Sequence, residues 1–501
     1  MSMTKYNGTS EPARITKWWP LLIIANILSM SHAISAENSR AVTNIAATSA
    51  STTDTEESGT AKIDTLYSNV IDVDELKLTP QFWQQSLRNQ QGSNANKVLM
   101  SPEQIEAFND EQFTRGSYLK NPLSFPVRLA PDTIAKFIRA ISKPASSERF
   151  YANGEILTPA HYQSYDEQMN LVSLKDYQDV RFAVVTKRTS LRTYPTLDRV
   201  FNANMDLDLD RFQETGAFPG ELLAVVHTSK DEKWHFVRSY NYRAWVQDKD
   251  IAFTSRSEAK QFIGEQQRLI VTGDKVHTTF NPTNEQTSQV QLDMGVSLPI
   301  LQHSDFEKYQ LHRHNPYTGY IVQLPTRDAK GQLKLEPTLI PKSADVSIGY
   351  LPFTQENIIN QAFKFLGERY GWGHDYNGRD CTGFVGEIYK TFGILMPRNS
   401  GQQGGDSYGV NLRFDKASTP SHKLPELANL EVGDLLYLPG HVAMFLGYHD
   451  GKPYIIHDVY GLGYVDHQGN PVKGILNGVS VTPLLPFKGY IHSLYNIKRI
   501  R

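Results

Sequence analysis

Cys381 is the residue with the clearest chemical potential, because it is the only cysteine among 501 residues. It follows Asp380 at the predicted start of a helix, and His441 and His457 lie downstream. A solitary thiol with histidines elsewhere in the chain is typical of a cysteine nucleophile. Because backbone N–H groups at a helix N-terminus and a nearby imidazole both favour a thiolate, we expect a lowered thiol pKa. The alternative is a buried, inert cysteine.

The two histidines lie in one predicted β-hairpin that spans residues 441–457. Symmetric pairing about His449 would place His441 directly opposite His457, and directly paired residues share one face with Cβ atoms about 4.5–5.5 Å apart. One imidazole could then take the thiol proton while the other fixes its tautomer, as in nucleophile–base–orienter triads. Without that register, both would be ordinary half-buried sheet residues.

The elements that would position these side chains form an α+β pattern over residues 348–501. Thr354 is predicted to cap a helix that ends at Gly367, and a second helix begins at Cys381. Strands are then predicted at 434–438, 441–446 and 454–458. This order of helices followed by antiparallel strands predicts a separate catalytic domain.

Residues 63–347, which precede this domain, show other sequence patterns. Residues 63–175 are predicted to form a mainly helical accessory domain, with helix starts at Ser101 and Pro131. From 176 the hydrophobic period changes to two, which predicts two small β-barrels at 176–256 and 257–347. Two such modules in tandem suggest binding or positioning rather than catalysis.

The N-terminal segment 1–36 is predicted to be a secretory signal peptide. Three basic residues precede the apolar run 18–28, and small residues follow at Ser31, Ala33 and Ala36. A flexible linker follows at 37–62, rich in Ser and Thr. We therefore expect an exported protein, periplasmic or secreted, with no stable membrane insertion after cleavage; an uncleaved anchor is the alternative.

The charge balance narrows the class of partner. With 51 basic and 53 acidic residues, nothing favours nucleic acid or an anionic membrane surface. His312 and His314 lie close together, but no acidic ligand at zinc-type spacing accompanies them. We expect no metal and no cofactor.

Several short motifs together resemble one family, the NlpC/P60 cell-wall cysteine peptidases. The motifs are Tyr370-Gly371-Trp372-Gly373, Arg379-Asp380-Cys381-Thr382-Gly383-Phe384, Met396-Pro397-Arg398-Asn399-Ser400, Gly433-Asp434-Leu435-Leu436 and Gly440-His441-Val442-Ala443-Met444. The two β modules resemble bacterial SH3-type domains. The resemblance implies a papain-like fold and hydrolysis of peptidoglycan stem peptides or muropeptides, at the bond between γ-D-glutamate and a diamino acid.

The resemblance also implies residue roles. Cys381, His441 and His457 match the triad, and Tyr370 matches a tyrosine that helps hold the oxyanion. The remaining matches and candidates would contact substrate, with Asp380 on the free amine of the stem's L-alanine: Asp380, Thr382, Ser400, Glu221, Tyr240 and Tyr242. Two positions depart from the family, because Thr382 replaces a serine and His374 a glycine. Two other functions stay open: an amidase or acyl-transfer enzyme with the same triad, and a non-catalytic wall-binding protein.

Overall fold

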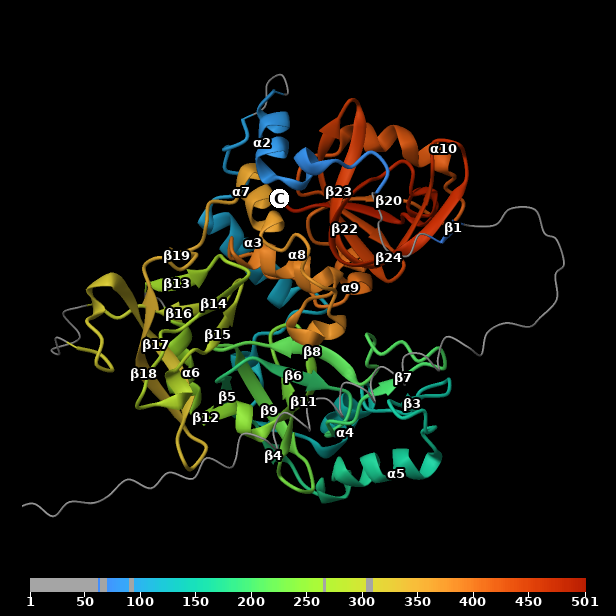
Figure 1. The fold of residues 1–501 in the computed structure, drawn as a ribbon. Coiled ribbons are helices and arrows are strands. Elements are labelled where there is room, and N and C mark those ends of the chain that lie inside the picture. The colour runs from blue at the N-terminus through green and yellow to red at the C-terminus, as the bar shows by residue number, and fades with distance from the viewer. Residues whose placement is uncertain (1–61, 64–69, 90–93, 265–266, 303–309) are drawn as a thin grey trace, which may run out of the picture. The chain divides into compact units, whose positions relative to one another are not determined.

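The computed structural model describes residues 62–63, 70–89, 94–264, 267–302 and 310–501 (Figure 1), all within one unit of the chain. The predicted signal peptide lies outside these residues, as does the predicted linker except for Lys62. In the part of the chain that the structure describes, no helix is long and apolar enough to cross a membrane.

The C-terminal part is built on a seven-stranded sheet with the order β1-β24-β23-β22-β21-β25-β20. Its strands are β1 (Lys62–Ile63), β20 (Val410–Arg413), β21 (Leu435–Leu438), β22 (His441–His449), β23 (Lys452–Val465), β24 (Pro471–Pro483) and β25 (Asn496–Arg499). Its helices are α7 (Gln355–Phe363), α8 (Cys381–Lys390), α9 (Ser400–Gly405), α10 (Pro420–Lys423), α11 (Lys488–Ser493) and the 3-10 helices η8 (Trp372–Asn377) and η9 (Leu424–Asn429). The predicted strands of this domain are all present.

Helix α8 lies against the sheet at β22 and β23, with α7 beside it (Figure 1). Its buried side chains include Phe384 and Ile388, which share a core with Val442 and Ile456. The helix begins at Cys381, as predicted, because the Asp380 carboxylate caps it by accepting the Gly383 N–H at 2.9 Å. These core contacts hold α8 against β22 and β23, and they therefore hold the thiol of its first residue beside this strand pair.

The first predicted β module is a seven-stranded sheet with the order β12-β5-β9-β10-β11-β6-β8. These strands are β5 (Arg181–Val185), β6 (Thr189–Arg192), β8 (Gln213–Ala217), β9 (Leu222–Thr228), β10 (Trp234–Arg238), β11 (Arg243–Gln247) and β12 (Ile251–Thr254), with η4 (Asp248–Asp250) between the last two. All of these strands lie within 176–256, the range predicted for the first β module.

The second predicted module follows α6 (Arg256–Ile263) and is divided among three small sheets, β16-β13-β19, β14-β15 and β17-β18. Its elements are β13 (Arg268–Val271), β14 (Lys275–His277), η5 (Glu285–Thr287), β15 (Gln291–Asp293), β16 (Ser297–Pro299), η7 (Pro316–Thr318), β17 (Gly319–Arg327), β18 (Leu333–Pro341) and β19 (Val346–Ile348). Apart from Ile348, these elements lie within 257–347, the range predicted for the second module. The prediction of a closed barrel remains a prediction.

The N-terminal helices are present, but their side chains enter two different cores. The elements are η1 (Glu75–Leu78), α2 (Pro80–Asn89), α3 (Pro102–Thr114), η2 (Pro122–Ser124), β2 (Arg128–Leu129), α4 (Pro131–Arg139), β3 (Phe150–Tyr151), α5 (Pro159–Gln168), η3 (Leu171–Ser173), β4 (Gln178–Asp179) and β7 (Val200–Phe201). Trp83 and Met100 are buried in the catalytic core, whereas Ile134 and Ile138 are buried with the β modules. The described helices of 63–175 thus do not share one core of their own.

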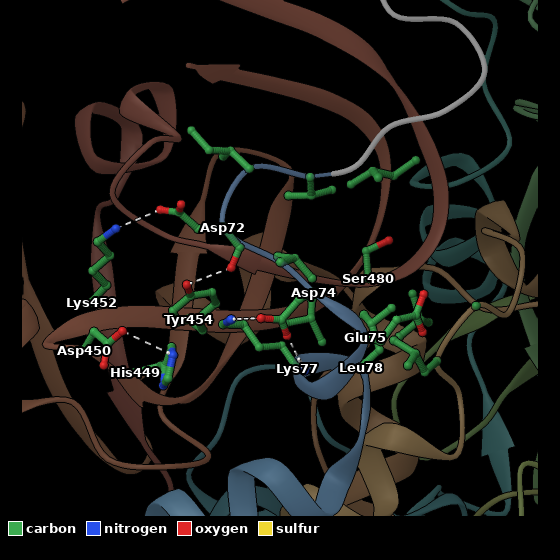
Figure 2. A pocket seen from close by; sticks show the side chains of 18 of the residues that line it. Asp72, Asp74, Glu75, Lys77, Leu78, His449, Asp450, Lys452, Tyr454 and Ser480 are labelled. Carbon is green, nitrogen blue, oxygen red and sulfur yellow. Dashed lines mark hydrogen bonds and ion pairs between the residues drawn. The ribbon is translucent and has the colours of Figure 1, made fainter. Parts of the chain in front are cut away.

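The segment before α2 lines a cleft of about 940 Å³ beside the β22–β23 hairpin (Figure 2). Lys452 Nζ donates to the Asp72 carboxylate at 2.9 Å, and the Tyr454 hydroxyl donates to the Asp72 carbonyl at 3.0 Å. The described residues that line this cleft include neither Cys381 nor His441. These contacts therefore fix the N-terminal segment to the sheet, away from the thiol.

Candidate active site

The Cys381 thiol lies at the junction of helix α8 and strand β22. It is 6% exposed and belongs to the core that contains Val442 and Met444. The backbone N–H of Val442 donates a hydrogen bond to the thiol. Because Val442 directly follows His441, this contact brings the start of β22 to the sulfur.

The two histidines are hydrogen-bonded to each other, and His457 also contacts two hydroxyl groups. His441 Nε2 lies 3.0 Å from His457 Nδ1, and His457 Nε2 lies 3.0 Å from Thr482 Oγ1. The Tyr490 hydroxyl lies 3.4 Å from the same His457 Nδ1. If His457 donates from Nε2 to Thr482, its Nδ1 accepts from His441 Nε2, and the lone pair of His441 stays on Nδ1. This arrangement is that of a base with an orienting partner.

The predicted hairpin register is wrong by three residues next to the turn and by two residues beyond a bulge, although the predicted meeting of the two rings is confirmed. The strands pair Met444 with Ile456 and His449 with Lys452, and a bulge lies between Phe445 and Gly447. The turn is therefore Asp450-Gly451 rather than centred on position 449. A shift of two residues keeps every side chain on its original face, so the two imidazoles still meet on a diagonal.

The predicted lowering of the thiol pKa is wrong for the resting site. Burial and the nearby Asp380 carboxylate raise the pKa of Cys381 to about 12, against the opposing hydrogen bond from Val442. Burial also lowers the pKa of His441 to about 4. The resting site therefore holds a neutral thiol and a neutral imidazole, and the proton must move as the thiol attacks.

Tyr370 lies near this pair. Its side chain is 8% exposed, and burial raises its pKa far above the ordinary value, with the Asp380 charge adding to the effect. The hydroxyl therefore keeps its proton at all working pH values. A protonated phenol is the donor that an oxyanion requires.

The Asp380 carboxylate is bound by Arg398 through a two-pronged ion pair. Arg398 Nη2 donates to Oδ2 at 2.7 Å and Nη1 to Oδ1 at 3.1 Å, while Thr382 Oγ1 donates to Oδ1 at 2.9 Å. Arg398 is the foremost group that holds the pKa of Asp380 far below its usual range, against burial. Asp380 is thus ionised, and both of its carboxylate oxygens already accept hydrogen bonds. The Thr382 hydroxyl donates to Asp380 and is not directed at an open cavity.

The first β module contributes to this site through strand β8. Thr215 Oγ1 accepts from Arg398 Nε at 2.6 Å. The preceding residue, Glu214, accepts from Thr193 Oγ1 at 2.6 Å and also from the Tyr242 hydroxyl. Sequence reasoning singled out Tyr242 but missed Glu214, whose two partners lie 21 and 28 residues away in the chain.

Glu221 and Tyr240, also predicted to contact substrate, are not brought to the thiol. Glu221 Oε1 accepts from Lys390 Nζ at 2.9 Å, and the Tyr240 ring lies 5.4 Å from that Nζ. Lys390 ends helix α8, nine residues after Cys381, which corresponds to about 13 Å along the axis. Both residues therefore lie at the opposite end of the helix.

His374 is buried near Asp380. Its Nδ1 accepts from the Gly216 N–H at 3.3 Å and its Nε2 donates to the Glu387 carboxylate at 3.0 Å. A Cβ at Gly383 would come within 2.7 Å of His374 Nε2, so this glycine makes room for the ring. Ser400 begins α9 and is buried, and the structure describes no hydrogen bond from its side chain.

Asp458 is a buried carboxyl next to His457. It is fully buried, and neither carboxyl oxygen has a hydrogen-bond partner among the described residues. Burial raises its pKa well above the ordinary value, with the Asp380 and Glu368 charges adding to the effect. We therefore treat Asp458 as a neutral carboxylic acid. Sequence reasoning did not identify it.

No cluster of metal-ligating side chains occurs in the described part of the chain. Of the pair considered from the sequence, His312 Nε2 donates to the carbonyl of Pro337 at 2.8 Å. That nitrogen is therefore occupied by the backbone.

Comparison with known proteins identifies two domains. Residues 367–474 match the model of the NlpC/P60 family, and residues 195–247 match an SH3 domain of the SH3b1 type. The fold resembles that of an NlpC/P60 endopeptidase from Photobacterium damselae subsp. piscicida, with a TM-score of 0.64 and 17% identity over 81% of this chain and 94% of that one. At this identity the likeness shows the fold alone.

Two curated relatives are similar over less than half of this chain. One is a gamma-D-glutamyl-L-lysine dipeptidyl-peptidase from Bacillus cereus (strain ATCC 10987 / NRS 248), 25% identical over 47% of this chain and 65% of the relative. The other is dipeptidyl-peptidase 6 from Lysinibacillus sphaericus, 26% identical over 43% of this chain and 71% of the relative. The chain thus spans just under two thirds of the first relative.

Proposed function

For a chain that carries an NlpC/P60 domain behind an SH3 domain of the SH3b1 type, we propose an exported cysteine peptidase of the cell wall. Its substrate is a peptidoglycan stem peptide, cut between γ-D-glutamate and a diamino acid. The observation that carries this proposal is the chain of hydrogen bonds from Thr482 through His457 to His441, beside the Cys381 thiol. The Bacillus cereus relative, a gamma-D-glutamyl-L-lysine dipeptidyl-peptidase, supports the choice of bond.

The mechanism uses the neutral resting pair. His441 Nδ1 takes the proton from Cys381 Sγ as the sulfur attacks the γ-carbonyl carbon of D-glutamate. The Tyr370 hydroxyl and backbone N–H groups at the start of α8 stabilise the oxyanion. His441 then protonates the leaving amine of the diamino acid, which leaves a thioester. Water, deprotonated by His441, hydrolyses the thioester and restores the thiol.

The amine end of the substrate is assigned to Glu214 and Tyr242. Because Arg398 already occupies Asp380 on both oxygens, that carboxylate has little capacity left for an ammonium. Glu214 accepts hydrogen bonds from Thr193 and Tyr242, and each carboxylate oxygen keeps a second acceptor position. The ammonium of a free L-alanine can pair with it. In this proposal Asp380 acts by holding Arg398 in place. Arg398 in turn donates to Thr215, the residue that follows Glu214 in β8.

The test is product analysis on L-Ala-γ-D-Glu-diaminopimelate, the L-lysine peptide and the N-acetylmuramyl-linked peptide. Release of L-Ala-D-Glu from the free peptides alone supports an amine-selective γ-glutamyl endopeptidase. Cleavage at the muramyl–alanine amide would instead indicate an amidase. The Cys381→Ser variant should keep its fold by circular dichroism and lose essentially all hydrolysis. Cleavage of none of the three by wild-type protein would favour a wall-binding protein.

A further inference from the structure

A second cavity, of about 610 Å³, lies where the N-terminal helices meet the first β module and the start of α9. Its lining carries three basic side chains, Lys120, Arg238 and Arg243. None of the described residues that line it is Asp or Glu. In a chain with nearly equal numbers of acidic and basic residues, a cavity with cations and no acids requires an explanation.

The two arginines face each other across the β10–β11 pair. Arg238 and Arg243 are direct cross-strand partners at the end of this ladder, and like charges in that position destabilise a sheet. Burial and the Arg243 charge lower the pKa of Arg238 to about 10. No carboxylate contributes to the pKa of either arginine. Without a bound anion, the pair is therefore unfavourable.

The donors of these arginines are only partly used. Arg238 Nη2 donates to the carbonyl of Tyr118, but Arg238 Nε is buried and has no partner among the described residues. The Arg243 guanidinium lies 5.1 Å from the ring centroid of Phe137 in helix α4, so it is stacked on an apolar wall. Lys120 Nζ donates to the carbonyl of Gly116. The cavity thus places two guanidinium groups next to an aromatic ring.

The other walls are apolar and include Phe125, Leu129, Ile141 and Phe236. A cavity of this volume falls within the range of about 300–1,000 Å³ that is usual for small-molecule sites. Guanidinium forks match the geometry of a carboxylate, and the apolar walls match an organic body rather than a bare ion.

We propose that this cavity binds a small organic carboxylate, with its carboxylate on Arg238 and Arg243 and its apolar body against Phe137 and Phe236. The site is separate from the thiol, and the inference does not depend on the proposed peptidase activity. Tyr242 connects the two places, because it lines the cavity while its hydroxyl donates to Glu214.

The test uses isothermal titration calorimetry on the purified protein with phenylacetate, its neutral isostere phenylacetamide, and inorganic phosphate. We expect phenylacetate to bind, and phenylacetamide and phosphate to bind at least about tenfold more weakly. The Arg238→Gln and Arg243→Gln variants should each weaken phenylacetate binding about tenfold or more. Arg243→Lys, which keeps the charge but loses the fork, should fall between wild type and Arg243→Gln.

The matched control is Arg115→Gln, which removes an exposed arginine of α3 paired only with Glu111. It should bind phenylacetate like wild type, and melting curves should show that all variants fold. Equal binding of phenylacetamide, no binding of phenylacetate in the millimolar range, or undiminished binding in both glutamine variants would overturn the proposal. Phosphate that binds as tightly as phenylacetate would contradict an organic ligand.

Discussion

Replacing Glu214 by Gln tests whether this carboxylate selects a free substrate amine. The side chain is half-buried and hydrogen-bonded by Thr193 and Tyr242, so the substitution removes the charge while keeping the shape. At an effective dielectric constant near 20, an ion pair at about 4 Å is worth about 4 kcal/mol before desolvation. Hydrogen bonds to charged groups contribute about 1.5–3 kcal/mol net. We take about 2 kcal/mol as the free energy that the Glu214 charge contributes to binding the substrate amine in the transition state, and its loss corresponds to about a 30-fold lower kcat/KM.

The assay compares kcat/KM for L-Ala-γ-D-Glu-L-Lys with that for the N-acetylated peptide. Glu214→Gln should lower the first value about 30-fold, by the reasoning above, and leave the second nearly unchanged. Glu221→Gln is the matched control, because Glu221 pairs with Lys390 at the far end of α8. It should leave the ratio of the two substrates as in wild type. Equal losses on both peptides in Glu214→Gln, or a larger change of the ratio in Glu221→Gln, would refute the assignment.

Three further predictions follow from the site. The rate of iodoacetamide alkylation of Cys381, the only cysteine, should rise continuously through pH 9, because burial raises its pKa; a plateau from pH 6 would contradict a neutral resting thiol. Thr482→Val should lower kcat/KM about three- to tenfold with unchanged circular dichroism, because His457 loses one hydrogen bond; wild-type activity would show that Thr482 does not fix the ring. Asp458 has a raised pKa when folded, so its contribution to stability is present below its unfolded pKa of about 4 and falls as pH rises. Asp458→Asn should remove that fall, which urea unfolding of both proteins at pH 5 and pH 8 measures. A variant that is less stable relative to wild type at pH 8 than at pH 5 would refute this.

The parts of the fold that depend on local signals were predictable from the sequence. Thr354 and Asp380 are N-cap residues, and α7 and α8 begin directly after them, at Gln355 and Cys381. The strands of the first β module also coincide with short apolar runs, which are buried along most of their length in β5, β9 and β10. Caps and short apolar runs act within a few residues, so they are visible without a tertiary structure.

The features that were not predictable depend on contacts between distant segments. The hairpin register differs from the prediction because the turn lies at Asp450-Gly451, and a bulge between Phe445 and Gly447 adds one residue to β22; nothing local specifies the bulge. Glu214 and Thr482 gain their roles only through residues far away in the chain. The lowered thiol pKa was predicted from the helix end and a nearby imidazole, whereas the burial that raises it comes from packing against the sheet.

The most direct test of the account is to incubate the protein and its Cys381→Ser variant with L-Ala-γ-D-Glu-diaminopimelate and to identify the products by mass. The account predicts that wild type releases L-Ala-D-Glu and free diaminopimelate, and that the variant, though folded, releases neither. Comparable release by the Cys381→Ser variant, or an intact peptide after incubation with wild type, would contradict a cysteine peptidase acting on this bond.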